Sequence, residues 1–381
     1  MDEMFSPVRD PLFRAQRLLR LAPREGLGAV RRAILYGLFA WVPIAAWAAA
    51  SGRLSGGDAQ EPLFAHFGIN LRCLLGIPLL VLSETVAEVV LARIVPRFAA
   101  SGVVSDREGL AAAIRSTERL RDARLPWVAI FVLTAMATLA GGVRAQQLDL
   151  MSWAVMGDGL GFGGHWFIFV ARPLFLLFLL AWLWRIALVT ILFRRIAALD
   201  LRLVPSHADR VGGLGFLEQA PLAFALVQLA ISSMVAAHTA HEILYHGAHV
   251  ASLKALMCVS IALVAILALV PLSAFAGPLR RARARARLDY GALAGRHARG
   301  LHARWVAGGA AEDEAILQAP EIGSAADMDA LYAAAAGMRP VPIGRNALVA
   351  VLLPAILPML LAVTADIPLK EILLKLAGAL G

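Results

Sequence analysis

Four histidines and one glutamate lie close together in the histidine segment "AHTAHEILYHGAHV", Ala237–Val250. If this segment is helical, a rotation of about 100° per residue places most of these side chains on one face. Imidazole and carboxylate groups that share a helix face are typical ligands of zinc and related transition metals. The segment therefore predicts a candidate metal site, zinc being the example, formed by His238, His241, Glu242, His246 and His249.

Other interpretations of the histidine segment stay open. Its order, H-x-x-H-E, differs from the H-E-x-x-H and H-x-x-E-H orders of helical zinc proteases, so it does not indicate a protease. Gly247 is a residue type that often ends a helix, which would move His249 away from the other rings. The rings are also typical of a polar helix end at a membrane interface, and the ordinary histidine pKa of about 6.5 suits a proton relay or a pH-sensitive gate.

Charged residues inside apolar stretches form a second candidate site. Glu84 and Glu88 are four residues apart in "VLSETVAEVVLARIV" and share a helix face, while Arg172 and Arg185 bound most of "RPLFLLFLLAWLWR". A charge at bilayer depth costs at least ~2.5 kcal/mol, so such residues usually face a partner or a water-filled pathway. From their depths we expect Glu88 to pair with Arg185. A structural ion pair and a permeation or proton pathway are both compatible with this pairing.

Arg172 is expected in the outer third of the membrane, directly before a proline and without a carboxylate in its own span. A long arginine side chain can extend to the interface, so Arg172 is predicted to do so or to meet an anion. Asp149 and Asp158, in the glycine-rich stretch before this span, are the candidate protein partners.

The third candidate is a glycine-rich loop within "LVPSHADRVGGLGFLEQAP", Leu203–Pro221. Such a turn can direct backbone N–H groups at an anion near a helix start. No Gly-Lys-Ser/Thr follows and no strand precedes, which excludes a Walker loop and a dinucleotide fingerprint. The string resembles an H-x-D-R-x-G-G-L-G-F-L signature of uncharacterised bacterial polytopic inner-membrane proteins, a resemblance that implies no activity. It singles out His207, Asp209, Arg210, Gly212, Gly213 and Gly215.

The elements that position these residues are predicted to be membrane-spanning helices. Of 381 residues 60% are hydrophobic and 17% charged, and the mean hydropathy is +0.71, which is typical of an integral membrane protein. A span needs about 20 apolar residues. Seven stretches satisfy this: Ala33–Ala50, Cys73–Ile94, Trp127–Val143, Trp166–Phe193, Pro221–Ala240, Leu253–Phe275 and Ala347–Val363. The third and seventh are short, and Pro354 and Pro358 leave a kinked or re-entrant seventh segment open.

Basic residues concentrate in alternate loops, which predicts a cytoplasmic amino terminus and an outward-facing histidine segment. The net charge of +9 is thus explained by topology, and no nucleic-acid partner is expected. Cys73 and Cys258 lie in apolar stretches and are expected to pack as small side chains.

The chain is predicted to form a single polytopic domain, residues 1–381, in the inner membrane. Its cytoplasmic parts are residues 1–32 and the helical loops 95–125 and 276–345, and residues 364–381 form an amphipathic helix. A helix start is expected at Ser105. The arginine-rich loops are candidates for binding anionic lipid headgroups, and a homo-oligomer is expected.

The fold class is therefore all-α, an integral membrane bundle of about seven helices. Buried charges and titratable groups at one mouth favour passage of an ion or small solute, as a channel or a transporter. Two alternatives stay open: a membrane enzyme that holds a metal at the histidine segment, and a sensor or assembly subunit without chemistry of its own.

Overall fold

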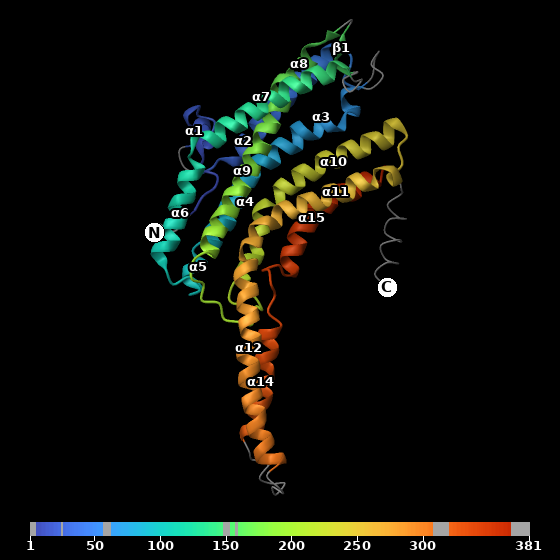
Figure 1. Ribbon diagram of the computed structural model, residues 1–381. Helices are drawn as coiled ribbons and strands as arrows, with labels where there is room; N and C mark the ends of the chain where they lie inside the picture. The colour runs from blue at the N-terminus through green and yellow to red at the C-terminus, as the bar shows by residue number, and fades with distance from the viewer. Residues whose placement is uncertain are drawn as a thin grey trace.

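The computed structural model describes residues 5–23, 26–55, 62–147, 153–156, 159–307 and 320–366. In these residues the chain forms a bundle of long helices, from which one helical hairpin projects (Figure 1). Seven helical segments are long and apolar enough to cross a membrane: Ala29–Ala50, Phe67–Ala100, Arg107–Ala140, Phe162–Ala197, Gly215–His246, Val250–Val306 and Arg345–Val363. The predictions of an all-α membrane bundle and of seven spans are therefore confirmed at this level.

Several spans contain short irregular turns. The first span is α2 (Ala29–Ala50). The second span joins α3 (Phe67–Leu71) to α4 (Ile77–Ile94) through the π-helical turn η2 (Arg72–Gly76). The fourth joins α8 (Phe162–Trp166) to α9 (Arg172–Ala197) through a second π-helical turn, η4 (Phe167–Ala171). The fifth is α10 (Ala225–His246), preceded by the 3₁₀ segment η5 (Gly215–Phe224). Two spans thus carry a π-helical turn, and such turns are frequent at functional sites.

The remaining spans are more regular. The third is α7 (Arg124–Gln147), the sixth is α11 (Val250–Leu269), and the seventh is α15 (Arg345–Val363). α15 contains Pro354 and Pro358 without interruption, so it forms one continuous helix. Large apolar side chains on α7, α11 and α15 are exposed, among them Leu139, Leu263 and Leu361. A lipid environment accounts for that surface, because water would make it unfavourable.

The smaller elements connect the spans. They are α1 (Pro11–Leu18), η1 (Leu63–Ala65), α5 (Arg97–Ala100), α6 (Arg107–Arg121), the 3₁₀ segment η6 (Val270–Phe275), and a two-stranded hairpin of β1 (Val155–Met156) and β2 (Gly159–Leu160). The side chain of Asp106, and not of the predicted Ser105, caps α6 by accepting from Gly109 N. The predicted amphipathic helix 364–381 lies almost entirely outside the described residues.

The projecting hairpin consists of α12 (Ala276–Leu301), extended by the π-helical turn η7 (His302–Val306), and α14 (Pro320–Ala336), which pack side by side (Figure 1). We call the bundle end from which it projects the hairpin end. The opposite end, where α10 ends at His246, is the histidine end. Arginine is repeated along α12, beginning one turn after the sixth span.

The core of the bundle is centred on α4 and α9, which contact each other. Near the hairpin end, Phe98, Phe193 and Phe275 pack with ring centroids 5.6–6.1 Å apart. In α9, Trp182 is fully buried and its Nε1 donates to the carbonyl oxygen of Leu80 at 2.7 Å. This contact fixes the register between the helices that carry Glu84 and Arg185, two buried charged residues.

Candidate functional site

A buried network of four charged side chains lies between the spans near the hairpin end. It joins Arg32 of α2, Glu84 of α4 and Arg185 of α9 to Asp10, which precedes α1. All four side chains are 0% exposed. Two arginines balance two carboxylates, so the network is neutral as a whole, which lowers the cost of burying it.

Arg185 is the centre of this network. Its Nε donates to Asp10 Oδ2 at 2.9 Å, and its Nη2 lies 2.8 Å from the same oxygen. Its Nη1 lies 2.9 Å from Glu84 Oε1. The guanidinium also lies over the ring of Trp182 at 5.1 Å. Arg185 therefore contacts two carboxylates and one aromatic face, which holds its position between α4 and the N-terminal segment.

Arg32 completes the network from the first span. Its Nη2 donates to Glu84 Oε2, its Nη1 donates to Gln16 Oε1 at 2.6 Å, and its Nε donates to the carbonyl oxygen of Leu27 at 2.9 Å. The ring of Phe13 covers its guanidinium at 5.0 Å. Two of these contacts come from α1, so this helix packs against the buried charges as well as the apolar core.

The predicted Glu88–Arg185 pair is wrong. Arg185 pairs with Glu84, one turn earlier on α4, and Glu88 instead contacts Ser6 Oγ and Arg9 Nε, the latter at 3.2 Å. The reason is the N-terminal segment, which packs beside α4 and supplies the partners of Glu88. Arg9 is 60% exposed, so Glu88 belongs to the edge of the bundle and not to the buried network.

Sequence reasoning missed Asp10 and Arg32 as members of the site, because residues 1–32 were assigned to a cytoplasmic segment. One local signal was present: Asp10 followed by Pro11 is typical of a helix start. In the structure, Asp10 Oδ1 indeed accepts from Phe13 N at 2.8 Å as the cap of α1. One carboxylate thus caps a helix and pairs with Arg185.

Arg172 lies at the other end of the same helix pair. It begins α9 directly after η4, and the guanidinium of Arg72, which begins η2 on the second span, lies over Phe167 and Phe175 of the fourth span. Neither arginine has a carboxylate partner among the described residues. The candidate partners Asp149 and Asp158 lie outside these residues. The second span was expected to begin at Cys73, so the place of Arg72 within this span is a finding of the structure.

The histidine segment forms the last turns of α10. His241 Nδ1 lies 3.1 Å from the carbonyl oxygen of Ala65, and its ring stacks on that of His66 with centroids 5.3 Å apart. The His246 ring packs against it edge-on, also at 5.3 Å. His66, the residue directly before the second span, is buried. It was not among the candidate site residues that the sequence indicated. These rings therefore pack mainly with each other.

The other members of the segment lie apart from this stack. His238 Nδ1 is 3.9 Å from Glu242 Oε1, beyond hydrogen-bond distance. Gly247 has φ +65° and ends α10, as expected, and His249 is placed beside Asp366, with Nδ1 3.6 Å from Oδ1. Within the described ranges, no group of three or more His, Cys, Asp or Glu side chains is arranged to hold a metal ion.

In the glycine-rich loop, Asp209 takes the place of an external anion. Its Oδ1 accepts from Val211 N at 2.9 Å and Gly213 N at 3.2 Å, and its Oδ2 accepts from Gly215 N at 2.8 Å. Partial burial raises the pKa of Asp209, but these three donors and the neighbouring His207 outweigh burial, so the pKa is lowered overall. The backbone donors that we expected to face a ligand are thus used by the loop itself.

The glycine-rich loop is hydrogen-bonded to the segment that leads from the hairpin into α15. Arg339 Nη2 donates to the carbonyl oxygen of Asp209 at 3.0 Å and to Glu218 Oε1 at 2.7 Å, and Arg339 N donates to the carbonyl oxygen of Arg210 at 2.7 Å. Arg210 has φ +57°, and Gly212 and Gly213 also have positive φ. The motif residues therefore have a clear structural role in joining the fifth and seventh spans.

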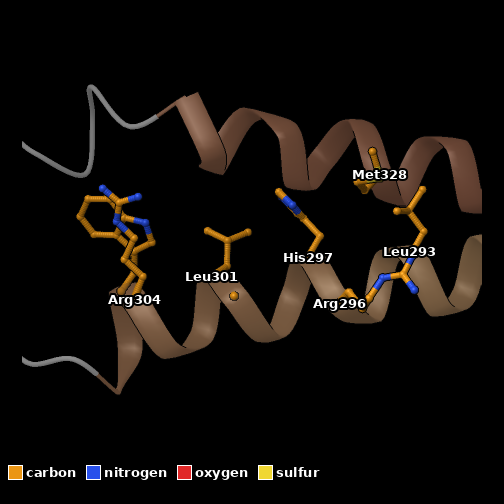
Figure 2. Close-up of a pocket in the computed structure, with 8 residues that line it drawn as sticks. Leu293, Arg296, His297, Leu301, Arg304 and Met328 are labelled. Carbon is orange, nitrogen blue, oxygen red and sulfur yellow. The ribbon is translucent and has the colours of Figure 1, made fainter.

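A groove lies near the tip of the projecting hairpin, between α12 and α14 (Figure 2). Its volume is about 460 Å³, and it is lined by Leu293, Arg296, His297, Gly300, Leu301, Arg304, Trp305 and Met328. His297 Nε2 lies 2.9 Å from Ser324 Oγ, so the ring bridges the two helices. Because the groove is open to solvent and far along the hairpin, it is separate from the buried charges of the bundle.

No protein-family model, no curated protein and no solved structure matches this chain.

Proposed function

We propose that this chain is a membrane transport protein that passes an ion or small solute along the pair of spans containing α4 and α9. The observation that supports this proposal is the arrangement of charge in two layers on the same two spans. Arg72 and Arg172 form the layer toward the histidine end, and Glu84 and Arg185 belong to the layer toward the hairpin end. At 1.5 Å per residue the layers are about 18 Å apart.

Charged residues inside a membrane are unfavourable and usually mark a pathway for substrate or ions. A purely structural pair would need one arginine and one carboxylate, whereas the hairpin-end layer joins four groups from four segments. One of them, Asp10, lies on a segment that does not cross the bilayer. In the present arrangement this segment covers Arg185 and Glu84 and closes an entrance at the hairpin end. Its withdrawal would make both side chains accessible from that end.

We further propose that the hairpin end is cytoplasmic, in a bacterial inner membrane, and that the protein works as a homo-oligomer. The positive-inside rule supports the orientation, because the arginine-rich α12 projects from this end. A single cysteine introduced at exposed Leu288, with Cys73 and Cys258 replaced, tests it: an impermeant maleimide should label it in inverted vesicles and not in intact spheroplasts.

Flux into proteoliposomes tests the transport proposal. The purified protein should pass at least one of sodium, potassium, protons, magnesium or chloride, at about pH 5 or about pH 8, a range that covers histidine titration. Arg185→Gln should change the rate, while Arg93→Gln, an exposed position on α4, should not. The absence of flux for every ion at both pH values would refute the proposal.

The projecting hairpin favours a second candidate function, that of a sensor or assembly subunit. Its tip groove combines two arginines with Trp305 and apolar side chains, a composition suited to a partner surface. If this function is correct, shortening the hairpin should abolish assembly with a partner. If transport is correct, the shortened protein should retain flux.

A further inference from the structure

Arg72 is half-buried and has an unusual environment for an arginine. Its guanidinium carbon lies 5.4 Å from the ring centroid of Phe167 and 5.5 Å from that of Phe175, so two aromatic faces cover it. Its Nε is buried and has no hydrogen-bond partner among the described residues. Aromatic rings attract a cation but accept no full hydrogen bond and leave its charge unneutralised. The Nε–H of this guanidinium therefore has no acceptor among the described residues.

Arg172 adds a second positive charge to the same place. It follows Phe167 in the fourth span and lies one turn before Phe175 on α9, so it adjoins the two residues whose rings cover Arg72. Both arginines adjoin π-helical turns: Arg72 begins η2 and Arg172 follows η4. A π-helical turn interrupts the regular hydrogen bonds of an α-helix. Here the second span contains such a turn at Arg72, and the fourth span contains one directly before Arg172.

The two charged layers differ in their balance. In the hairpin-end layer two arginines are matched by two carboxylates. In the histidine-end layer the described residues supply two arginines and no carboxylate. A charge inside a membrane span without a partner is unfavourable, and a second like charge nearby makes it more so. A bound anion would satisfy both guanidinium groups at once.

We propose that Arg72 and Arg172 form a binding site for a small anion between the second and fourth spans. The site rests on the proposed transport function and names its substrate class, a halide or small carboxylate. A guanidinium whose faces are covered presents its edge, the geometry that suits such ligands. The two spans pack closely here, because a Cβ on Gly76 would lie 2.9 Å from Phe175 Cε2.

Thermal unfolding of the full-length protein in detergent tests binding without any need for transport. Sodium chloride and sodium acetate should each raise the Tm above its value in sodium gluconate at equal ionic strength, because a ligand that binds only the folded state stabilises it. Arg72→Gln and Arg172→Gln should remove the shift, and Arg93→Gln should retain it. Arg72→Lys, which keeps the charge, covers the case in which the glutamine variant does not fold, and it should retain a smaller shift.

Two results would overturn the site. One is an equal wild-type Tm in chloride, acetate and gluconate. The other is an unchanged shift in both glutamine variants. If Asp149 or Asp158 neutralises the arginines, the first result is expected, and Asp149→Asn or Asp158→Asn should then create an anion-dependent shift that the wild type lacks.

Chloride and sodium flux in proteoliposomes separates the site from the transport proposal. Chloride flux that falls at least tenfold in Arg72→Gln supports both. An anion-dependent Tm shift without flux of any ion retains the site and refutes transport. Cation flux that is unaffected by Arg72→Gln, with no Tm shift, retains transport and refutes the site.

Discussion

Arg185 and Asp10 are 175 positions apart in the chain, yet Arg185 Nε donates to Asp10 Oδ2 at 2.9 Å and both side chains are fully buried. The contact joins the fourth span to a segment that precedes the first. It also closes a chain of charges that continues through Glu84 to Arg32. The stability of the bundle should therefore depend on one carboxylate outside the spans.

The first prediction concerns Asp10→Asn. The substitution leaves Arg185 and Arg32 opposite the single carboxylate of Glu84, so the buried network gains a net positive charge. We expect a loss of about 3–5 kcal/mol in the free energy of unfolding, the usual effect of breaking a buried pair. Thermal or denaturant unfolding in detergent measures it.

Arg14→Gln is the control, because Arg14 pairs with Asp122 at 2.5 Å but is 51% exposed, and Asp122 keeps its contact with Arg121 at 3.0 Å. Exposed pairs contribute about 0–1 kcal/mol, so this variant should be near wild type. The double variant Asp10→Asn with Arg185→Gln should recover part of the loss. Equal stability of the two single variants would contradict the network.

The second prediction distinguishes the two glutamates of α4. Glu84→Gln should be strongly destabilising, because Arg32 and Arg185 would both lose a buried counter-charge. Glu88→Gln should cost about 1 kcal/mol or less, because its partner Arg9 is 60% exposed. The Tm values of the two variants check this order, and the reverse order would favour the pairing of Glu88 with Arg185.

The third prediction concerns the glycine-rich loop. In Asp209→Asn an amide nitrogen can replace the oxygen that accepts from Gly215 N, leaving this donor unmatched at a cost of about 1–3 kcal/mol. Hydrogen exchange at Val211, Gly213 and Gly215 should accelerate. Slow exchange that is unchanged in the variant would show that the carboxylate does not hold the loop.

This loop should also depend on pH in a defined direction. The pKa of Asp209 is lowered from its ordinary 3.8 in the folded protein. Its contribution to stability is therefore complete above pH 3.8 and is lost as the pH falls toward the lowered pKa. The acid sensitivity of the Gly215 amide exchange should disappear in Asp209→Asn.

The fourth prediction concerns zinc. His241 packs on His66, while His238 and His249 point to separate carboxylates. Stoichiometric zinc should thus change the Tm of the untagged wild type no more than that of His238→Ala with His241→Ala. A zinc-dependent rise confined to the wild type would instead restore the metal site.

The fifth prediction concerns lipid at the base of the hairpin. Exposed Arg280 and Arg281 lie within about 8 Å of the start of α12, where the hairpin leaves the bundle, whereas Arg296 and Arg299 are about 30 Å or more along α12. The field of anionic headgroups falls off within about 8 Å. Glutamine at both basal positions should weaken phosphatidylglycerol binding about fivefold per arginine, whereas the distal pair should have little effect. Lipid retention by native mass spectrometry measures both.

The sequence predicted the spans well because their signal is local. About twenty apolar residues identify a span whatever it packs against. Gly247 likewise ended its helix as expected, because a positive φ is a property of one residue. The partners of buried charges were not predicted, since Glu84 and Glu88 share a helix face and only the packing of the N-terminal segment distinguishes them.

The π-helical turns of the second and fourth spans, Arg72–Gly76 and Phe167–Ala171, were also not predicted from the sequence. Pro78 and Pro173 follow these turns within two residues, but a proline in the first turn of a helix is common and does not by itself indicate a π-helical turn. The side chains that lie around Arg72 and Arg172 depend on how the two spans pack, as the rings of Phe167 and Phe175 over Arg72 show. For this reason the histidine-end layer was recognised only in three dimensions.

The contact between Asp10 and Arg185 also has a consequence for biosynthesis. A ribosome adds about 5–20 residues per second, so the arginine emerges roughly 10–35 s after the aspartate. During that interval three spans enter the membrane while Asp10 lacks its partner Arg185. Arg32 and Glu84 can already form their contact before Arg185 is synthesised. The first described segment to be translated is thus among the last to reach its final position, and a bulky N-terminal fusion would interfere with maturation more than with insertion.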